Sequence, residues 1–218
     1  MKHEKIKKLC VMSMLCALAY VVMMVIKVPV ILFLKYEPKD VIITFGGFLY
    51  GPAAALIISA VVSFIEMLTV SDTGWIGFVM NVVSTAAFSC TAAAIYRKKH
   101  TLWGAILGLL SGVVAMVAVM IAWNYLLTPL YMGTPRADVA EMLLPVFLPF
   151  NLLKGILNSA IILLLFRPTV QGLRSAKLFP QSSSDRKPSL LSRILLWSLS
   201  FLAVAACVLV ILHYNGII

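Results

Sequence analysis

The sequence predicts an all-α integral membrane protein, with six transmembrane helices in a core and an additional C-terminal transmembrane helix. Of its 218 residues, 62% are hydrophobic and only 12% are charged. A soluble domain carries about 25% charged residues, so this chain lacks the polar surface that contact with water requires. Six long apolar blocks alternate with short basic or acidic segments, a pattern that is typical of helices that cross a bilayer.

The first apolar block covers residues 9–34 and follows a basic segment at residues 2–8. The run Ala17-Leu18-Ala19 resembles a signal-peptide cleavage site, but the apolar stretch continues to Ile26. Because about 20 apolar residues span the hydrocarbon of a bilayer, an uncleaved first helix is favoured. Lys27 lies in the outer third of this helix, where its side chain is expected to reach toward the interface.

The distribution of lysine and arginine sets the direction of the crossings. Cytoplasmic loops carry an excess of these residues, and residues 2–8, 97–99 and 167–193 together hold 13 of the 18 basic residues. We therefore expect all three segments, and with them the N-terminus, on the cytoplasmic side. An even number of crossings must then separate residues 2–8 from residues 97–99. The blocks at 9–34 and 76–96 each cross once, so the apolar block between them, at 41–68, must cross twice and hold two helices.

Glycine and proline mark where this block divides. Gly46-Gly47 and Gly51-Pro52 interrupt it near its middle, and proline is well tolerated in the first turn of a helix. We predict a short helix at 41–51 and a second helix at 52–68. The short helix reaches only about 16 Å at 1.5 Å per residue, so neighbouring helices must shelter it from lipid.

Three further helices complete the predicted core, at residues 76–96, 102–128 and 142–166. The core is thus residues 1–168. Residues 169–189 are rich in serine and proline and predict a flexible cytoplasmic linker. Residues 190–218 contain the extra C-terminal transmembrane helix, at 190–212, which ends on the outer side.

Polar side chains at membrane depth are costly and mark functional sites. Asn151 and Lys154 lie three residues apart, on one face of the last core helix, and Pro145 and Pro149 are expected to bend its start. Lys154 is about a dozen residues from the cytoplasmic end at Arg167, too deep for an interfacial anchor on that side. The alternative is a lysine that reaches outward to the interface; we favour a ligand or an ion pair.

Other polar residues have structural alternatives as well. Asn124, Tyr125 and Thr128 end the helix before Pro129 and could cap its carbonyls. Asp40 could pair with a helix N-terminus, and Asn81 could form an interhelical hydrogen bond. We nevertheless expect one outward-facing, substrate-binding pocket. Its predicted residues are Asn151, Lys154, Asn124, Asp40, Tyr125, Thr128, Glu66 and Asn81.

Several aromatic residues are expected at the same level as this pocket. Interfacial Trp and Tyr are common in membrane proteins, so this signal is weak by itself. Together with amide and lysine donors, it suits a flat heteroaromatic ligand held between apolar walls. The aromatic residues are Tyr36, Trp75, Phe78, Trp123, Tyr125 and Tyr131.

Small residues recur at a spacing of four in two helices. Gly104, Gly108 and Gly112 allow close approach of a neighbouring helix, and packing within the core is the favoured interpretation. Ser13 and Ala17 have the same spacing on the first helix, where they could dock a partner membrane protein.

Several function classes are excluded by the sequence pattern. The four cysteines show no paired spacing and the three histidines are scattered, so we expect no disulfide framework, metal site or catalytic triad. The net charge of +10 lies at the ends of apolar segments, so we expect a lipid bilayer and no nucleic acid as partner. No phosphate-binding G-x-x-x-x-G-K-[ST] loop occurs.

Five motifs stand out over roughly residues 5–170. Three of them are Lys35-Tyr36-Glu37-Pro38-Lys39-Asp40, the Gly-Gly-Phe-Leu-Tyr-Gly-Pro stretch at 46–52, and Thr73-Gly74-Trp75 through Met80-Asn81. The two most specific are Asn124-Tyr125 with Thr128-Pro129-Leu130-Tyr131, and Phe150-Asn151-Leu152-Leu153-Lys154-Gly155. Together they resemble the riboflavin-specific S component of energy-coupling-factor (ECF) vitamin transporters.

The resemblance implies a six-helix, multi-pass plasma-membrane subunit that binds riboflavin on the outer side and does no covalent chemistry. Riboflavin would be a transported ligand and not a cofactor, with Asn151, Lys154 and Asn124 at contact positions. The implied partners are a transmembrane T subunit and two ATP-binding-cassette ATPases on separate chains. Paired alanines on the first helix usually dock the T subunit, and Ser13 replaces one of them here.

Two alternative functions remain open, and one segment of the chain departs from the family pattern. The chain could carry another heterocyclic vitamin, such as thiamine, or it could be an integral membrane enzyme acting on a lipid. The enzyme is disfavoured because the acidic residues lie mainly in the predicted outer segments. The linker and the helix at 190–212 have no counterpart in the family pattern, and they could alter partner docking.

Overall fold

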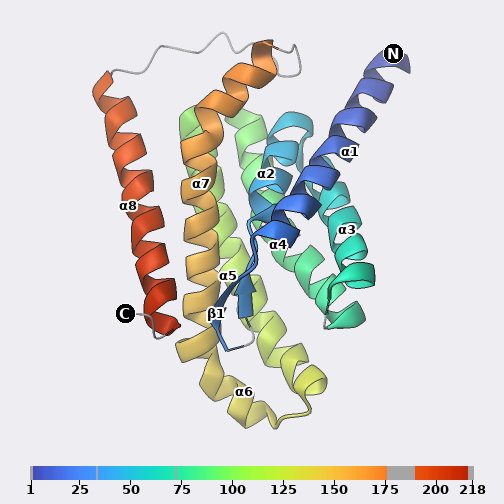
Figure 1. Cartoon of the computed structure of the whole chain (residues 1–218), viewed down its shortest axis with the longest axis vertical. Helices are drawn as coiled ribbons and strands as arrows, with labels where there is room; N and C mark the ends of the chain where they lie inside the picture. The colour runs from blue at the N-terminus through green and yellow to red at the C-terminus, as the bar shows by residue number, and fades with distance from the viewer. Residues whose placement is uncertain (1, 33, 72, 176–189, 216–218) are drawn as a thin grey trace.

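A computed structural model of the chain describes residues 2–32, 34–71, 73–175 and 190–215. They form a bundle of helices with one small β-hairpin, shown in Figure 1. The α-helices are α1 (Lys2–Val25), α2 (Lys39–Tyr50), α3 (Pro52–Thr69), α4 (Gly74–Lys99), α5 (Leu102–Met132), α6 (Arg136–Met142), α7 (Leu148–Ser175) and α8 (Leu190–Tyr214). The remaining elements are the strands β1 (Val28–Ile31) and β2 (Leu34–Tyr36), which pair antiparallel, and the π-helix η1 (Leu143–Phe147).

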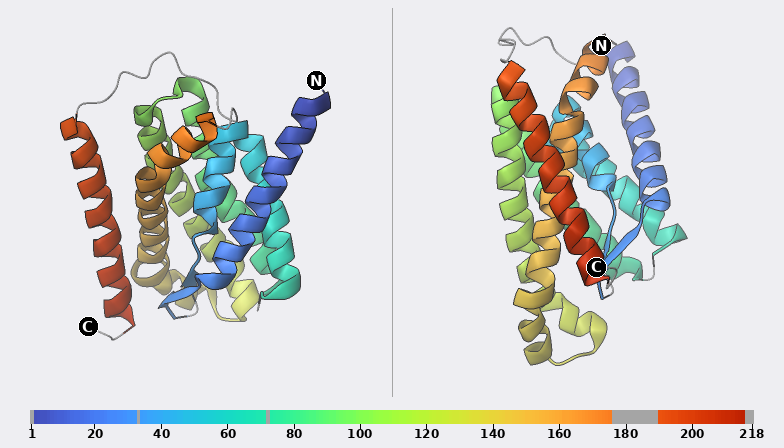
Figure 2. Two further views of the ribbon diagram at one scale, coloured as in Figure 1. Left: turned by 45° about the horizontal axis from the view of Figure 1, so that its top comes forward. Right: turned by 60° about the vertical axis from the view of Figure 1, so that its left-hand side comes forward.

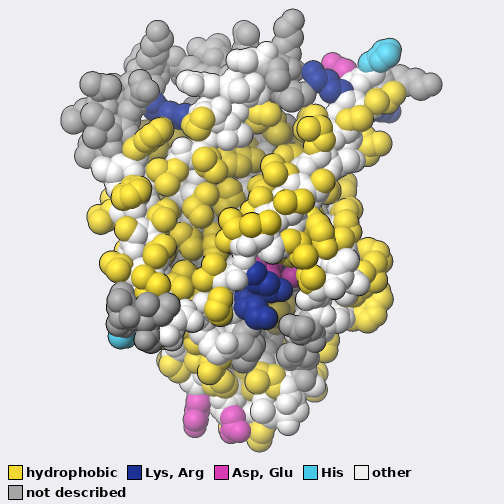
Figure 3. Space-filling view, in the orientation of Figure 1, with side chains coloured by type: hydrophobic (Ala, Val, Ile, Leu, Met, Phe, Trp, Pro, Cys, Tyr) yellow, Lys and Arg dark blue, Asp and Glu magenta, His cyan; other side chains and the backbone are white. Residues whose placement is uncertain are grey.

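The predicted fold class is confirmed. Within the described residues, six helices are long and apolar enough to cross a membrane: α1, α3, α4, α5, α7 and α8. The start of α1 and the end of α7 lie at the same end of the molecule, and α8 returns to the opposite end (Figure 1). Hydrophobic side chains cover most of the described part of the face shown in Figure 3, while charged groups lie near its two ends and in one compact, mainly basic group in the lower half.

The predicted division of the block at 41–68 is also confirmed. Helix α2 has only 12 residues, and Pro52 stands at the first turn of α3. Gly51 joins the two helices at φ = +88°, a conformation that glycine adopts without a Cβ clash. The short α2 packs among α1, α3, α4 and α7, and Ile43, Phe45 and Phe48 are buried. Its neighbours therefore supply the shelter that its length requires.

Several boundaries differ from those predicted. The hairpin was not predicted, because four- and three-residue strands leave little alternation in the sequence. Helix α5 continues through Pro129 to Met132 and does not end at 128. Helix α7 likewise continues through Pro168 to Ser175, so the first seven residues of the predicted linker are helical. The rest of that linker, residues 176–189, lies outside the described residues.

The predicted bend before the last core helix takes the form of a π-helical turn. Pro145 lies inside η1, where it cannot donate the backbone hydrogen bond of a regular helix. A wider π-turn accommodates this loss and redirects the chain. The bend separates the short α6 from the long α7.

The three glycines of α5 pack against α4, as the favoured interpretation predicted. A Cβ atom at Gly108 would lie 2.6 Å from the carbonyl oxygen of Ala92. One at Gly112 would lie 2.6 Å from the carbonyl oxygen of Phe88. Because backbone atoms cannot move aside as a side-chain tip can, these glycines set the distance between the two helices.

We expect Gly108→Ala to lower the free energy of unfolding by roughly 1–3 kcal/mol, the usual cost of overpacking a core. The matched control is Gly172→Ala in α7, where nothing lies within 4 Å of the added methyl group. Thermal unfolding of both variants in detergent checks the prediction. Equal melting temperatures would contradict the close packing of α4 on α5.

Candidate ligand-binding site

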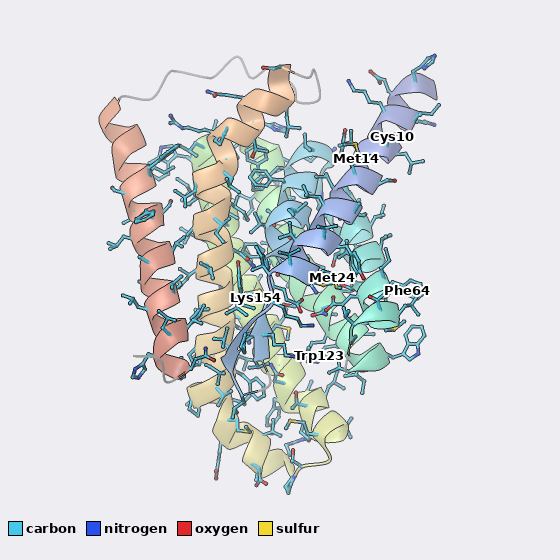
Figure 4. All side chains as sticks on the ribbon, in the orientation of Figure 1. Cys10, Met14, Met24, Phe64, Trp123 and Lys154 are labelled. Atoms are coloured by element: carbon cyan, nitrogen blue, oxygen red, sulfur yellow. The ribbon has the colours of Figure 1, made fainter. Side chains whose placement is uncertain are left out.

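A cavity of about 170 Å³ lies between the hairpin, α3, α4, α5, η1 and α7. It occupies the half of the molecule away from the N-terminus, near the labelled Lys154 in Figure 4. Its lining residues are Lys27, Leu34, Lys35, Glu37, Glu66, Ser71, Thr73, Met80, Asn81, Ser84, Met120, Asn124, Thr128, Phe147, Phe150, Asn151 and Lys154.

Six of the eight predicted site residues line this cavity: Glu66, Asn81, Asn124, Thr128, Asn151 and Lys154. Tyr125 does not: its side chain is 41% exposed, and its ring lies 5.5 Å from the guanidinium carbon of Arg136. Each residue turns a helix by about 100°, so Tyr125 points away from the face that Asn124 and Thr128 share. The structure therefore places Tyr125 outside the lining of this cavity.

Asp40 is the eighth predicted residue, and it lies behind the cavity wall. Its carboxylate is completely buried and forms an ion pair of 3.0 Å with Lys154 Nζ. It also accepts hydrogen bonds from Thr85 Oγ1 (2.7 Å) and from Asn158 Nδ2 (3.4 Å). Asp40 thus ties the start of α2 to α4 and α7 and fixes the lysine head. Lys154 is buried, and the alternative of a lysine reaching outward is wrong.

A second group of charges surrounds Lys39, which is 1% exposed. Its ammonium group lies 2.8 Å from Glu37 and pairs directly with Glu66. Lys27 lies 3.3 Å from Glu37, and Asn81 Nδ2 donates to Glu66 Oε2 at 3.1 Å. Charges that are buried in this way must be paired to persist.

The sequence interpretation of this group needs two corrections. Lys27 was expected to reach outward, but it pairs with Glu37 and lines the cavity. Lys39 was not predicted as a site residue, although its run of neighbouring charges at 35–40 was a usable signal. Burial alone would raise the pKa of Glu37, between β2 and α2, but the ammonium groups of Lys39 and Lys27 hold that pKa below its ordinary value.

Three polar side chains of the cavity are oriented by their own helices. Asn124 Nδ2 donates to the carbonyl oxygen of Met120 at 2.7 Å, and Thr128 Oγ1 donates to Asn124 Oδ1 at 2.9 Å. Asn151 Nδ2 donates to the carbonyl oxygen of Phe147 at 2.7 Å. An amide group carries two N–H donors and an acceptor oxygen with two lone pairs. Each asparagine is thus held in place while it keeps hydrogen-bonding capacity for a ligand.

The aromatic lining differs from the predicted one. Phe147 and Phe150 line the cavity, whereas none of the five predicted aromatic residues with described side chains does so. Trp75 is 67% exposed, and Tyr36 is buried with its hydroxyl donating to Asn158 Oδ1 at 2.8 Å. The side chain of the sixth, Tyr131, lies outside the described residues. Helical spacing from Asn151 and Lys154 back to positions 147 and 150 would have identified the two phenylalanines.

The small residues predicted to dock a partner lie on the surface of α1. Ser13 and Ala17 are both exposed, and Ser13 Oγ donates to the carbonyl oxygen of Leu9 at 3.0 Å. That bond turns the hydroxyl back onto its own helix. Helix α8 lies on the far side of the bundle from α1 (Figure 1), so it does not cover this surface.

The family model for the substrate-specific component of ECF transporters matches residues 7–166. The chain belongs to this family. It is 34% identical to the riboflavin transporter RibU of Staphylococcus aureus (strain TCH60), over 74% of this chain and 89% of that one. It is 29% identical to the riboflavin transporter FmnP of Bacillus subtilis (strain 168), over 79% and 98% of the two chains.

A solved structure reported as "Structure and mechanism of the S component of a bacterial ECF transporter" has the same fold. The two chains are 32% identical with a TM-score of 0.65, over 78% of this chain and 99% of that one. This S component is therefore a multi-pass membrane protein with a C-terminal segment that the family match does not cover. The family match ends at residue 166, and α8 lies entirely beyond it.

Proposed function

We propose that this S component is the riboflavin-binding membrane subunit of an ATP-driven ECF importer. The observation that carries the proposal is that Asn124, Asn151 and Lys154 line the same cavity. Two relatives that match most of the chain are riboflavin transporters, and this supports riboflavin as the ligand.

The chemistry of the cavity suits a flavin. The pyrimidine edge of an isoalloxazine ring alternates hydrogen-bond donors and acceptors, which amide groups and an ammonium group can match. Phe147 and Phe150 supply apolar surface for the flat rings. The hydroxyl groups of the ribityl chain can donate to the carboxylates of Glu37 and Glu66, which also line the cavity.

The proposed partners are a transmembrane T subunit and two ATP-binding-cassette ATPases, with Ser13 and Ala17 on the T-subunit contact. We place the N-terminus in the cytoplasm and the cavity toward the outside, because basic residues recur at the start of α1 and in the last turn of α4. Labelling of the exposed Cys10 by a membrane-impermeant maleimide in intact cells would contradict this orientation. The subunit itself would bind and release the vitamin without covalent chemistry.

Purification followed by calorimetry tests the proposal directly. We expect yellow flavin to co-purify with the protein, and riboflavin to bind tightly to ligand-free protein while thiamine does not. Thiamine binding without riboflavin binding would support the alternative vitamin. The absence of riboflavin binding to folded, ligand-free protein would refute the proposed function.

We expect Asn151→Ala and Lys154→Ala each to weaken riboflavin binding by roughly 1–3 kcal/mol, the usual cost of leaving a buried polar partner unsatisfied. The matched control is Tyr125→Ala, which changes a neighbouring residue outside the cavity lining. Calorimetric titration of the three variants measures the effect. Unchanged affinity in both cavity variants would show that the ligand binds elsewhere.

A further inference from the structure

Helix α8 has no place in the family match, yet it packs against the wall of the cavity. It contacts α7 and strand β1. Cys207 and Ile211 of α8 are buried in one apolar cluster with Val30 and Ile31 of β1 and with three residues of α7. In the right-hand view of Figure 2, the C-terminal end of α8 lies beside the hairpin.

A directed hydrogen bond joins the end of α8 to the same strand. Asn215 Nδ2 donates to the carbonyl oxygen of Pro29 at 3.0 Å and to the carbonyl oxygen of Ile211 at 2.8 Å. The amide has two N–H groups, so one can hold the strand while the other fixes the side chain to its own helix. Pro29 has no backbone N–H, as is usual on a strand edge. Helix α8 therefore covers an edge of β1 that β2 does not pair.

The strand that α8 contacts belongs to the hairpin, which forms part of the cavity lining. Leu34 and Lys35 of β2 line the cavity, and so do Lys27 and Glu37 at the two ends of the hairpin. A two-stranded hairpin is marginally stable by itself, so its position depends on what packs against it. Displacement of β1 would carry β2 and its lining residues with it.

We propose that α8 is a positioning element for the hairpin and that it slows the release of the ligand from the cavity. Asn215 and Ile211 act through β1 and do not touch the ligand. The effect on release rests on the proposed function, whereas the effect on the hairpin does not. Relatives that lack α8 would hold the hairpin less firmly.

Two variants of the full chain test the proposal, Asn215→Ala and Ile211→Ala. The matched control is Leu209→Ala, because Leu209 lies on α8 but is 56% exposed. Hydrogen–deuterium exchange of the amides at 28–36 is measured without ligand. The dissociation rate of riboflavin is measured by stopped-flow fluorescence. Both rates should rise about twofold to tenfold in each test variant, as expected for the loss of one net hydrogen bond or a comparable contact, and should stay unchanged in the control.

Two results would overturn the proposal. One is unchanged hairpin exchange in both test variants, which would show that α8 does not position the hairpin. The other is faster exchange with an unchanged dissociation rate, which would show that the hairpin does not control release. If the wild-type protein binds no riboflavin, the proposed function fails, and the exchange measurement still decides whether α8 positions the hairpin.

Discussion

Replacing Asp40 with alanine is expected to lower the free energy of unfolding by about 3–5 kcal/mol, the range for breaking a buried ion pair from one side. The substitution leaves the Lys154 ammonium group buried without its carboxylate at 3.0 Å. It also removes the acceptor for Thr85 and Asn158. Reversible unfolding in mixed micelles measures the loss. Riboflavin affinity should fall as well, because the lysine head is no longer fixed beside the cavity.

Three further variants separate the ion pair from the loss of any one carboxylate: Asp138→Ala, Lys154→Met, and the double variant of Asp40 and Lys154. Asp138→Ala is the matched control, since Asp138 is exposed on α6, and its effect should stay within about 0.5 kcal/mol. The double variant Asp40→Ala with Lys154→Met should cost less than the sum of the two single variants, because it removes both charges. An Asp40→Ala variant as stable as Asp138→Ala would contradict the paired arrangement.

Replacing Lys39 with methionine is expected to cause a loss of the same size, about 3–5 kcal/mol. Lys39 lies between Glu37 and Glu66, and methionine would fill much of its volume without its charge. Two carboxylates would then face each other in a site with little access to water, so one must take up a proton or be exposed. Unfolding in mixed micelles and the level of folded protein in membranes report this loss.

A second substitution near Lys39 and one control variant test whether repulsion between the two carboxylates causes the loss. Adding Glu66→Gln to Lys39→Met should restore part of the lost stability, because the remaining Glu37 still pairs with Lys27 at 3.3 Å. Lys98→Met, at the exposed end of α4, should have little effect. If the double variant is less stable than Lys39→Met alone, repulsion between the two carboxylates is not the cause.

Much of the fold follows from the sequence because each feature is local. Apolar length predicts a crossing, and Gly51-Pro52 predicts the break between α2 and α3, because glycine adopts the required φ and proline begins a helix. Positive charges predict which helix ends lie together. Short stretches of sequence do not determine the hairpin or the continuation of α5 and α7 through proline. Both features depend on packing partners that short sequence windows do not reveal.

Part of the candidate site could also be predicted, because the spacing of residues along one helix is a local feature. Asn151 with Lys154 and Asn124 with Thr128 share helix faces by spacing alone, so the cavity-lining face of each helix was predictable. Tyr125 is adjacent to Asn124 in the sequence but lies outside the cavity lining, because one residue turns a helix by about 100°. The partners of each charge were not predictable from the spacing of residues.

The sequence by itself determined that this is a multi-span helical membrane protein, which end of the bundle carries the positive charge, and which polar residues must be sheltered from lipid. Composition and periodicity suffice for these conclusions because the bilayer imposes the same requirement on every crossing segment. Only the tertiary structure decided that Asp40 pairs with Lys154, that Glu37 and Glu66 share Lys39, and that Asn215 at the end of α8 donates to Pro29 of the hairpin. These contacts join segments far apart in the chain, and a buried charge selects its partner by distance after the helices have packed.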